Sequence, residues 1–207
     1  MTKEDIIQRE KDKYNHIHKK ERYGAKTGRV KQFKLAKNKL HTAVKTAIKQ
    51  SKNLIDIGCG KGGFMDYFNN TYYNLKVVGL DIAEEVKKHR PDLNIIISDA
   101  GNIPFPDNEF DFVCHQDGLE HIPEELLIDT LNEEFRVCNK YMYFTIATHS
   151  VKHNDDIYKE MGLGAIHINM KTAKEWKRVF IEFVEKNNIR NWIFDADKNW
   201  VYIYLEK

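Results

Sequence analysis

Short apolar runs alternate with amphipathic stretches from Leu54 onward, and this alternation limits the possible fold more than any other feature of the chain. The runs lie at 54–57, 75–80, 95–97, 110–114 and 141–146. The stretches between them, at 62–70, 83–90 and 123–137, carry apolar residues at helical spacing. Strands separated by helices form parallel βαβ units with helices on both faces of the sheet. The sequence therefore predicts an α/β fold with a doubly wound, mostly parallel sheet.

The two ends of the chain differ from this pattern. Near the C-terminus, Thr172-x-x-Glu175 is a capping box that predicts a helix to about Lys186. Apolar segments at 192–194 and 200–205 then flank a polar turn, which predicts an antiparallel hairpin at the sheet edge. At the N-terminus, polar and basic residues with helical spacing predict a helical extension. We expect this extension at 1–50 and the main domain at 51–207.

Composition excludes several classes of protein. No apolar run approaches the roughly 20 residues of a membrane-spanning helix, and the N-terminus lacks the plan of a signal peptide. The three cysteines, Cys59, Cys114 and Cys138, have no C-x-x-C spacing, which is typical of buried thiols in a reducing compartment. We therefore expect a cytoplasmic protein.

The stretch "NLIDIGCGKGGF", residues 53–64, contains the G-x-G-x-x-G pattern of a dinucleotide-binding loop. Asp56, however, stands two residues before the first glycine, where its charge would repel a pyrophosphate. In an open α/β sheet the ligand binds at the carboxyl ends of the strands. Asp81, Asp99 and Asp117 also fall at the ends of predicted strands, and Asp81 has the spacing from Gly60 of an acid that binds a ribose. Four strands thus bring four acids to one edge.

These acids favour a cationic ligand. S-adenosylmethionine has a ribose diol, an adenine amine, an ammonium and a sulfonium group balanced by one carboxylate, so acids bind it through charge-assisted hydrogen bonds. A nicotinamide dinucleotide carries a negative pyrophosphate, so Asp56 disfavours it. A nucleotide-cofactor oxidoreductase stays open as an alternative from another class of enzyme.

Four segments together carry a resemblance to a known family. In order, "LIDIGCGKG", "VVGLDIA", "ISDAGNIPFPDNEFDFV" and "DGLEHIP" resemble the successive motifs of class I S-adenosylmethionine-dependent methyltransferases, over about residues 53–147. The resemblance implies that the methionyl end of the cofactor lies at Asp56, Gly58 and Gly60, with Cys59 as a small packing residue. It further implies ribose and adenine contacts for Asp81, Ile82, Asp99, Ala100 and Gln116.

The absence of certain motifs narrows the range of possible methyl acceptors. Enzymes of this family that methylate exocyclic amines of DNA carry an Asp/Asn-Pro-Pro-aromatic run after the fourth strand, where this chain has residues 115–118, "HQDG". Cytosine C5 chemistry commonly uses a cysteine after proline, and neither Cys114 nor Cys138 follows one. The segment 120–123, "EHIP", resembles small-molecule and glycan methyltransferases. We therefore expect O-methylation of a small-molecule or saccharide-like acceptor, with or without a phosphate group.

Histidines are the candidate general bases, because their pKa range suits proton transfer near neutrality. His121 is expected to open a helix at the active site, although an orienting or core role stays open. The insert 148–169 follows the fifth strand, and loops longer than ~15 residues in compact domains are usually functional. It supplies His149 and His167 as further base candidates and Asn169 as an acceptor contact. We expect no metal at His149-x-x-x-His153 with Asp155, because this polar loop lacks supporting residues.

The N-terminal segment "YNHIHKKERYGAKTGR" resembles the lid that many small-molecule methyltransferases fold over the cofactor. By this resemblance Tyr14, His18 and Tyr23 cover the site and Arg22 meets a phosphate or carboxylate of the acceptor; a simple packing helix is the alternative. Residues 1–52 hold 16 basic against 5 acidic residues. This charge keeps an RNA methyltransferase as an alternative, and a non-catalytic cofactor-binding subunit is a further one.

Overall fold

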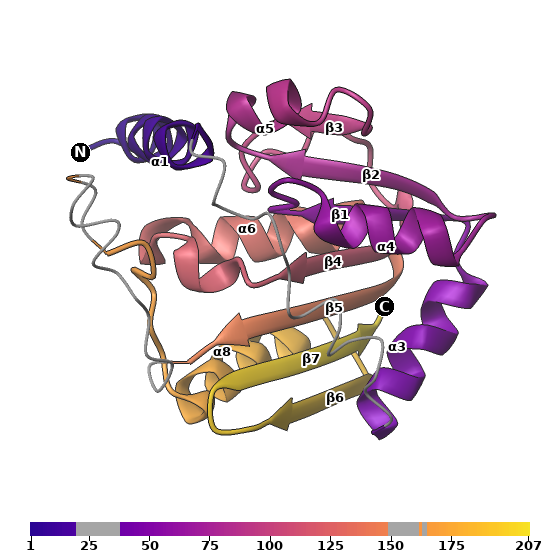
Figure 1. Cartoon of the computed structure of the whole chain (residues 1–207). Helices are drawn as coiled ribbons and strands as arrows, with labels where there is room; N and C mark the ends of the chain where they lie inside the picture. Colours follow the sequence, from indigo (N-terminus) through magenta and orange to yellow (C-terminus); the bar gives the residue numbers. More distant parts are fainter. Residues whose placement is uncertain (20–37, 149–161, 163–164) are drawn as a thin grey trace.

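Seven strands form one sheet in the order β3-β2-β1-β4-β5-β7-β6 (Figure 1). The computed structural model describes residues 1–19, 38–148, 162 and 165–207. The strands are β1 Asn53–Ile57, β2 Lys76–Asp81, β3 Ile95–Ile97, β4 Phe110–Gln116, β5 Cys138–Ala147, β6 Asn191–Ala196 and β7 Trp200–Glu206. The central strand β4 is buried along its whole length, because helices cover both faces of the sheet.

The direction of the strands changes across the sheet. β1 pairs in parallel with both β2 and β4, β2 with β3, and β4 with β5. β7 is antiparallel to β5 and β6, so the C-terminal hairpin forms the edge of the sheet. The chain runs outward from β1 through β2 and β3 and then returns to β4 on the other side of β1. The carboxyl ends of β1 and β4 therefore form the switch point, where ligands of open α/β sheets bind.

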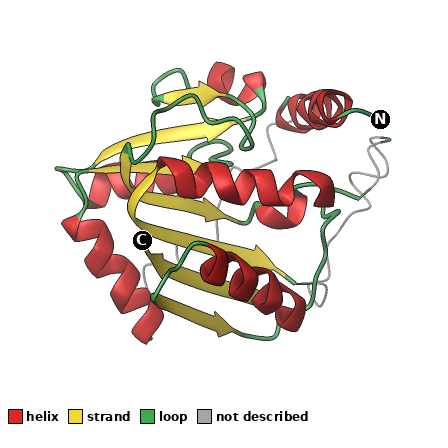
Figure 2. Cartoon of the chain, turned by 180° about the vertical axis from the view of Figure 1, so that it is seen from behind, coloured by secondary structure: helices red, strands yellow, loops and turns green. Residues whose placement is uncertain are grey.

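Helices cover the two faces of the sheet in two groups (Figure 2). One face carries α3 Lys39–Gln50, α4 Gly63–Thr71 and α5 Glu84–His89, whose apolar residues share a core with Leu54 and Phe112. The other face carries α6 Glu124–Val137 and α8 Ala173–Lys186. There Trp176 and Phe180 are completely buried. Two separate cores thus hold the sheet between them.

Helix α1, Lys3–His18, lies beyond the carboxyl ends of the strands, next to α5 (Figure 1). It begins at a capping box formed by Thr2 and Asp5. Asn15 Oδ1 accepts a hydrogen bond from the backbone N–H of Glu85 (3.1 Å) at the start of α5. Lys11 forms an ion pair with Glu84 (2.8 Å). These contacts hold α1 over the edge of the sheet at which the switch point opens.

The structure confirms the predicted fold class, including the antiparallel C-terminal hairpin and the helical N-terminal segment. The prediction that His121 opens a helix is wrong. His121 ends a short 3₁₀ turn, η1 Leu119–His121, and α6 begins only at Glu124. Pro123 explains the difference, because a proline disfavours helical geometry at the preceding residue, and Ile122 is extended (φ −80°, ψ 127°).

The division into residues 1–50 and 51–207 stays a prediction. Among the residues that the structure describes, no helix has both the length and the apolar composition needed to cross a membrane.

Candidate active site

The glycine-rich turn after β1 is held in place by Asp81, the last residue of β2. Gly58 and Gly60 have positive φ angles (64° and 50°), a conformation that side chains disfavour. One carboxylate oxygen of Asp81 accepts the backbone N–H of Gly60 (2.9 Å), and the other accepts that of Ala83 (2.9 Å). The N–H of Cys59 donates to Leu80 O (3.0 Å). Two hydrogen bonds therefore fix the turn to the carboxyl end of β2, and the bond from Ala83 holds the Asp81 carboxylate in place.

Asp56 is buried in the sheet beneath this turn. Its side chain is 2% exposed, and its Oδ1 accepts the thiol of Cys114 on β4 (3.4 Å). Burial raises the pKa of Asp56 to about 7, whereas the Cys114 thiol and the charge of His115 act in the opposite direction. A carboxylate in this position gains strongly from a nearby cation.

Three further predicted cofactor contacts lie at the same edge. Asp99, two residues after β3, has a raised pKa because of burial, opposed by the N–H groups of Gly101 and Ala100. Ile82 follows Asp81 directly and is partly buried. Gln116 ends β4 and is buried, and apart from a weak interaction with the Cys114 thiol its Nε2 has no hydrogen-bond partner among the described residues. A buried amide donor of this kind suits a ligand acceptor.

Cys59 is buried between the turn and its neighbours, like the other two thiols. A side-chain carbon added at Gly79 would stand only 2.7 Å from its Sγ. Burial raises the pKa of the thiol well above its usual value, which disfavours a nucleophilic role. The contacts of Cys59 are those of a packing residue.

A buried ion pair, which the sequence did not indicate, lies below the switch point. His115 Nδ1 on β4 is 2.6 Å from Glu134 Oε1 on α6, and both side chains are almost inaccessible. Burial acts to lower the pKa of His115, but the Glu134 carboxylate outweighs it and raises the pKa. Gly118 passes so close that a side-chain carbon there would come within 1.9 Å of His115 Nε2. No motif spacing in the sequence predicts this pair, because the pair arises from the packing of α6 on β4.

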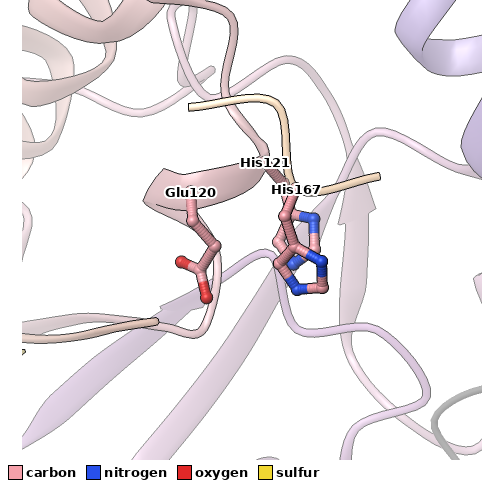
Figure 3. A group of neighbouring side chains, drawn as sticks. All are labelled: Glu120, His121 and His167. Carbon is pink, nitrogen blue, oxygen red and sulfur yellow. The ribbon is translucent and has the colours of Figure 1, made fainter. Parts of the chain in front are cut away.

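Two of the three predicted base candidates lie together. The rings of His121 and His167 have centroids 4.4 Å apart. His121 Nδ1 is 3.0 Å from Ile166 O, and the N–H groups of Ile168 and Asn169 donate to Glu120 O (3.1 and 2.9 Å). These hydrogen bonds attach the 166–169 segment to η1. Figure 3 shows the resulting group of Glu120, His121 and His167. The buried side chain of Glu120 also belongs here, and sequence reasoning assigned it no role.

Helix α1 connects the histidine pair with the glycine turn. The Tyr14 ring meets His121 edge-on, with centroids 6.1 Å apart, and lies 6.5 Å from the ring of His18. His18 Cε1 stands 3.8 Å from the position that a side-chain carbon would take at Gly60. Burial lowers the pKa of His18, opposed by Asp81 and assisted by Lys61. Tyr14 and His18 therefore span the distance between the two parts of the site.

The remaining predicted contacts divide into two groups. Asn169 is buried, its Oδ1 accepts from Lys171 Nζ, and its Nδ2 has no hydrogen-bond partner within the described ranges. Outside the described residues lie His149, His153, Asp155, Arg22 and Tyr23.

Comparison with known proteins gives a consistent result. Residues 55–145 match the family described as "Methyltransferase domain". The chain is 30% identical over 112 residues to the phthiotriol/phenolphthiotriol dimycocerosates methyltransferase of Mycobacterium tuberculosis, a match that covers 51% of this chain and 40% of that protein. It is 32% identical over 98 residues to the demethylmenaquinone methyltransferase of Staphylococcus saprophyticus (44% of this chain, 41% of that protein). These matches thus span less than half of the length of either relative.

The fold is also that of solved methyltransferases. A methyltransferase from Archaeoglobus fulgidus, described as "SAM dependent", superposes with a TM-score of 0.60 at 16% identity over 80% of this chain and 90% of that one. The two chains therefore share the same fold.

Proposed function

We propose, since residues 55–145 match the family described as "Methyltransferase domain", that this chain transfers a methyl group from S-adenosylmethionine to an oxygen atom of a small-molecule acceptor. The observation that carries the proposal is the junction of Asp81 with the glycine turn. Its carboxylate fixes Gly60 at the switch point of the sheet, where open α/β proteins bind their ligands.

The residues at the strand ends fit this cofactor. When bound, S-adenosylmethionine supplies a methyl group on a positively charged sulfur atom. The carboxylates of Asp56 and Asp81 offer negative charge to its cationic methionyl end and acceptors to its ribose hydroxyls. The proposed cofactor contacts are Asp56, Gly58, Cys59, Gly60, Asp81, Ile82, Asp99, Ala100 and Gln116.

The acceptor is proposed to lie beside the histidine pair, next to α1. Methyl transfer to a hydroxyl requires loss of its proton and a close, in-line approach to the methyl carbon. His121 and His167 are the described groups with suitable chemistry, and Tyr14 packs against His121. We assign activation of the acceptor oxygen to the histidine pair, and we assign positioning to Tyr14, His18 and Asn169.

The type of acceptor is less closely defined than the reaction. The sequence favours a small-molecule or saccharide-like acceptor, and the names of the relatives refer to phthiotriol dimycocerosates and to demethylmenaquinone. A third relative, from Mycolicibacterium smegmatis, is named fatty-acid O-methyltransferase. A hydroxyl or carboxyl oxygen on a small molecule is common to the sequence expectation and to this last name. The cytoplasm is the proposed location.

One observation favours a second acceptor class. The excess of basic residues in 1–52 would attract a polynucleotide, as in an RNA methyltransferase. Such binding weakens steeply as salt rises, because counterions are released from the phosphates. Salt-dependent RNA binding that saturates at one molecule per chain would favour this alternative over a small molecule.

Calorimetry and an acceptor screen test the proposal. We expect S-adenosylhomocysteine and S-adenosylmethionine to bind with one site per chain and NAD not to bind. The screen would present sugars, sugar phosphates, quinols, fatty acids and short RNAs with methyl-labelled cofactor, and mass spectrometry would locate the methyl group. NAD binding without binding of either sulfur cofactor would contradict the proposal and favour an oxidoreductase. Cofactor binding without methylation in any arm of the screen would favour a non-catalytic subunit.

A further inference from the structure

Glu120, His121 and His167 form a compact group of side chains that the proposed methyl transfer uses only in part. Each offers one donor atom, and these three atoms all lie within 4.8 Å of one another. Figure 3 shows the two imidazole rings beside the Glu120 carboxylate. Two imidazoles and one carboxylate are a common ligand set for transition metals in enzymes.

The backbone around the group already sets its geometry. His121 Nδ1 faces Ile166 O (3.0 Å), so in the neutral ring the proton belongs on Nδ1 and the lone pair on Nε2. Metal-binding histidines are oriented in this way, by a hydrogen bond from the other ring nitrogen. His167 is brought alongside because Ile168 and Asn169 donate their N–H groups to Glu120 O. Two separate parts of the chain thus converge on one point.

The buried carboxylate of Glu120 favours a positive ion at this point. Its side chain is completely buried (0% exposed), and its Oε1 accepts the N–H of Ala147 at the end of β5 (3.1 Å). Burying a carboxylate is costly unless positive charge lies close to it, and the Glu120 carboxylate already acts on His115, whose pKa it helps to raise. A divalent cation held jointly with the two imidazoles would add positive charge beside Glu120.

We propose that Glu120, His121 and His167 together bind one divalent transition-metal ion. Imidazole ligands favour zinc, iron, cobalt or nickel over magnesium and calcium, which prefer oxygen ligands. Two ligand atoms on a tetrahedral zinc ion, each about 2.1 Å from it, lie about 3.4 Å apart. Small side-chain rotations therefore close the group around an ion. Three protein ligands leave a coordination position open, as in catalytic and not structural sites.

The open position gives the ion a role, which rests on the proposed function. A cation at this point would polarise the acceptor hydroxyl and lower its pKa, so that the proton passes to water. The oxygen lone pair then forms the bond to the methyl carbon, and the carbon–sulfur bond breaks with its electron pair retained by sulfur. In this scheme the two histidines act as ligands and His121 does not itself take the proton.

Metal binding is tested without any acceptor. The full chain, produced without an affinity tag and treated with a chelator, is titrated with Zn²⁺ by calorimetry and with Co²⁺ by visible absorption. We expect one saturable site and a cobalt spectrum with nitrogen ligands. His167→Ala should weaken binding at least tenfold, and Glu120→Gln and His121→Ala should do the same. His89→Ala is the matched control, because His89 is exposed on α5, and it should bind as the wild type does.

Two outcomes would overturn the proposal. The first is wild-type protein that shows no stoichiometric site for either ion. The second is His167→Ala that binds as tightly as His89→Ala. Since His167 is only partly buried in an irregular segment, its truncation is the variant least prone to misfolding, and circular dichroism checks each variant.

Cofactor titration separates this proposal from the proposed function. Chelated wild-type protein should still bind S-adenosylhomocysteine, because the cofactor residues lie outside the metal-binding group. Metal binding without cofactor binding would overturn methyl transfer and leave the metal site intact. Cofactor binding without metal binding would overturn the metal site and leave the proposed methyl transfer intact.

Discussion

The acidic edge, formed by Asp56, Asp81 and Asp99, and the histidine cluster, formed by Glu120, His121 and His167, lie at the same end of the sheet but are built differently. Each acid belongs to a parallel strand or follows one within two residues. Their relative positions are therefore set by strand register, such as the pairing of Asp56 with Gly79 and of Asp81 with Ile97. The histidine cluster instead joins a 3₁₀ turn to an irregular segment.

The difference concerns stability as well as geometry. The acidic edge can be lost only if the central strands separate. His167 is held beside His121 through three hydrogen bonds, from His121 to Ile166 O and from Ile168 and Asn169 to Glu120 O. Each such bond contributes about 1 kcal/mol net, so the cluster can open locally while the sheet stays folded. We infer that the acidic edge serves binding and the histidine cluster serves the chemical step.

The largest expected effect is on turnover in the histidine cluster. His121→Ala should lower kcat about 1000-fold, whether His121 takes the acceptor proton or binds the ion that lowers its pKa, because activation of this kind typically contributes 10²–10⁴-fold. Cofactor affinity should change less than threefold by calorimetry. His89→Ala, on the exposed end of α5, is the control. If kcat stays within twofold of wild type, His121 does not activate the acceptor; if affinity falls with kcat, the two regions are not separate.

Asp81→Ala should produce the opposite pattern. The variant loses both carboxylate acceptors, for Gly60 N and Ala83 N, together with the proposed ribose contact. We expect cofactor affinity to fall about 100-fold, or about 3 kcal/mol. Asp107→Ala, which removes an exposed carboxylate, should leave affinity unchanged. Unaltered affinity of Asp81→Ala in calorimetry would remove this residue from the cofactor site.

A pH series tests whether the ionised form of Asp56 is needed for cofactor binding. The pKa of Asp56 is raised to about 7 by burial, with Cys114 and His115 opposing and Asp81 reinforcing the rise. Because the folded-state pKa lies above the ordinary value, the contribution of this group to stability is full at low pH and is lost as the pH rises through about 7. A cationic ligand needs the ionised form, so cofactor affinity should be about tenfold weaker at pH 6 than at pH 8.

Asp56→Asn is the control for this pH series, because its amide cannot ionise. Its cofactor affinity should be low and nearly independent of pH over the same range. A wild-type affinity that is equally flat between pH 6 and pH 8 would show that Asp56 does not titrate on binding.

The smallest expected effect concerns α1, which connects the two regions. Asn15→Ala removes the acceptor for Glu85 N at the start of α5, a contact of about 1 kcal/mol. Looser docking of α1 should weaken cofactor binding about threefold and raise the acceptor KM by a similar factor. His16→Ala, the exposed next residue, is the matched control. Equal behaviour of both variants would mean that α1 only packs and does not cover the site.

The acidic edge could be predicted from the sequence because the length and order of the apolar runs determine where the parallel strands end. Asp56, Asp81 and Asp99 follow apolar runs of strand length, and parallel strands must end together. The same reasoning predicts that His121 lies near the site, but it does not predict the 3₁₀ turn that His121 ends. Helical spacing alone does not include the effect of Pro123 on the backbone of Ile122.

The buried partners were beyond sequence reasoning. His115 meets Glu134 only because α6 packs on β4 with a particular rotation, and no spacing rule contains that rotation. The approach of His167 to His121 depends on backbone bonds to Glu120 O, which any residue type could make. Side-chain identity therefore carries no signal for either contact, and the role predicted for His167 from the length of the insert stays a prediction.

The attachment of Ile168 and Asn169 to Glu120 O has a consequence for how such a protein can diverge. The bonds pin the returning chain immediately after His167, so the position of that histidine does not depend on how many residues connect it to β5. Doubling the length of a loop between two fixed ends costs only about 0.6 kcal/mol in closure entropy. The chain between β5 and this attachment can therefore change in length or composition while His167 stays beside His121.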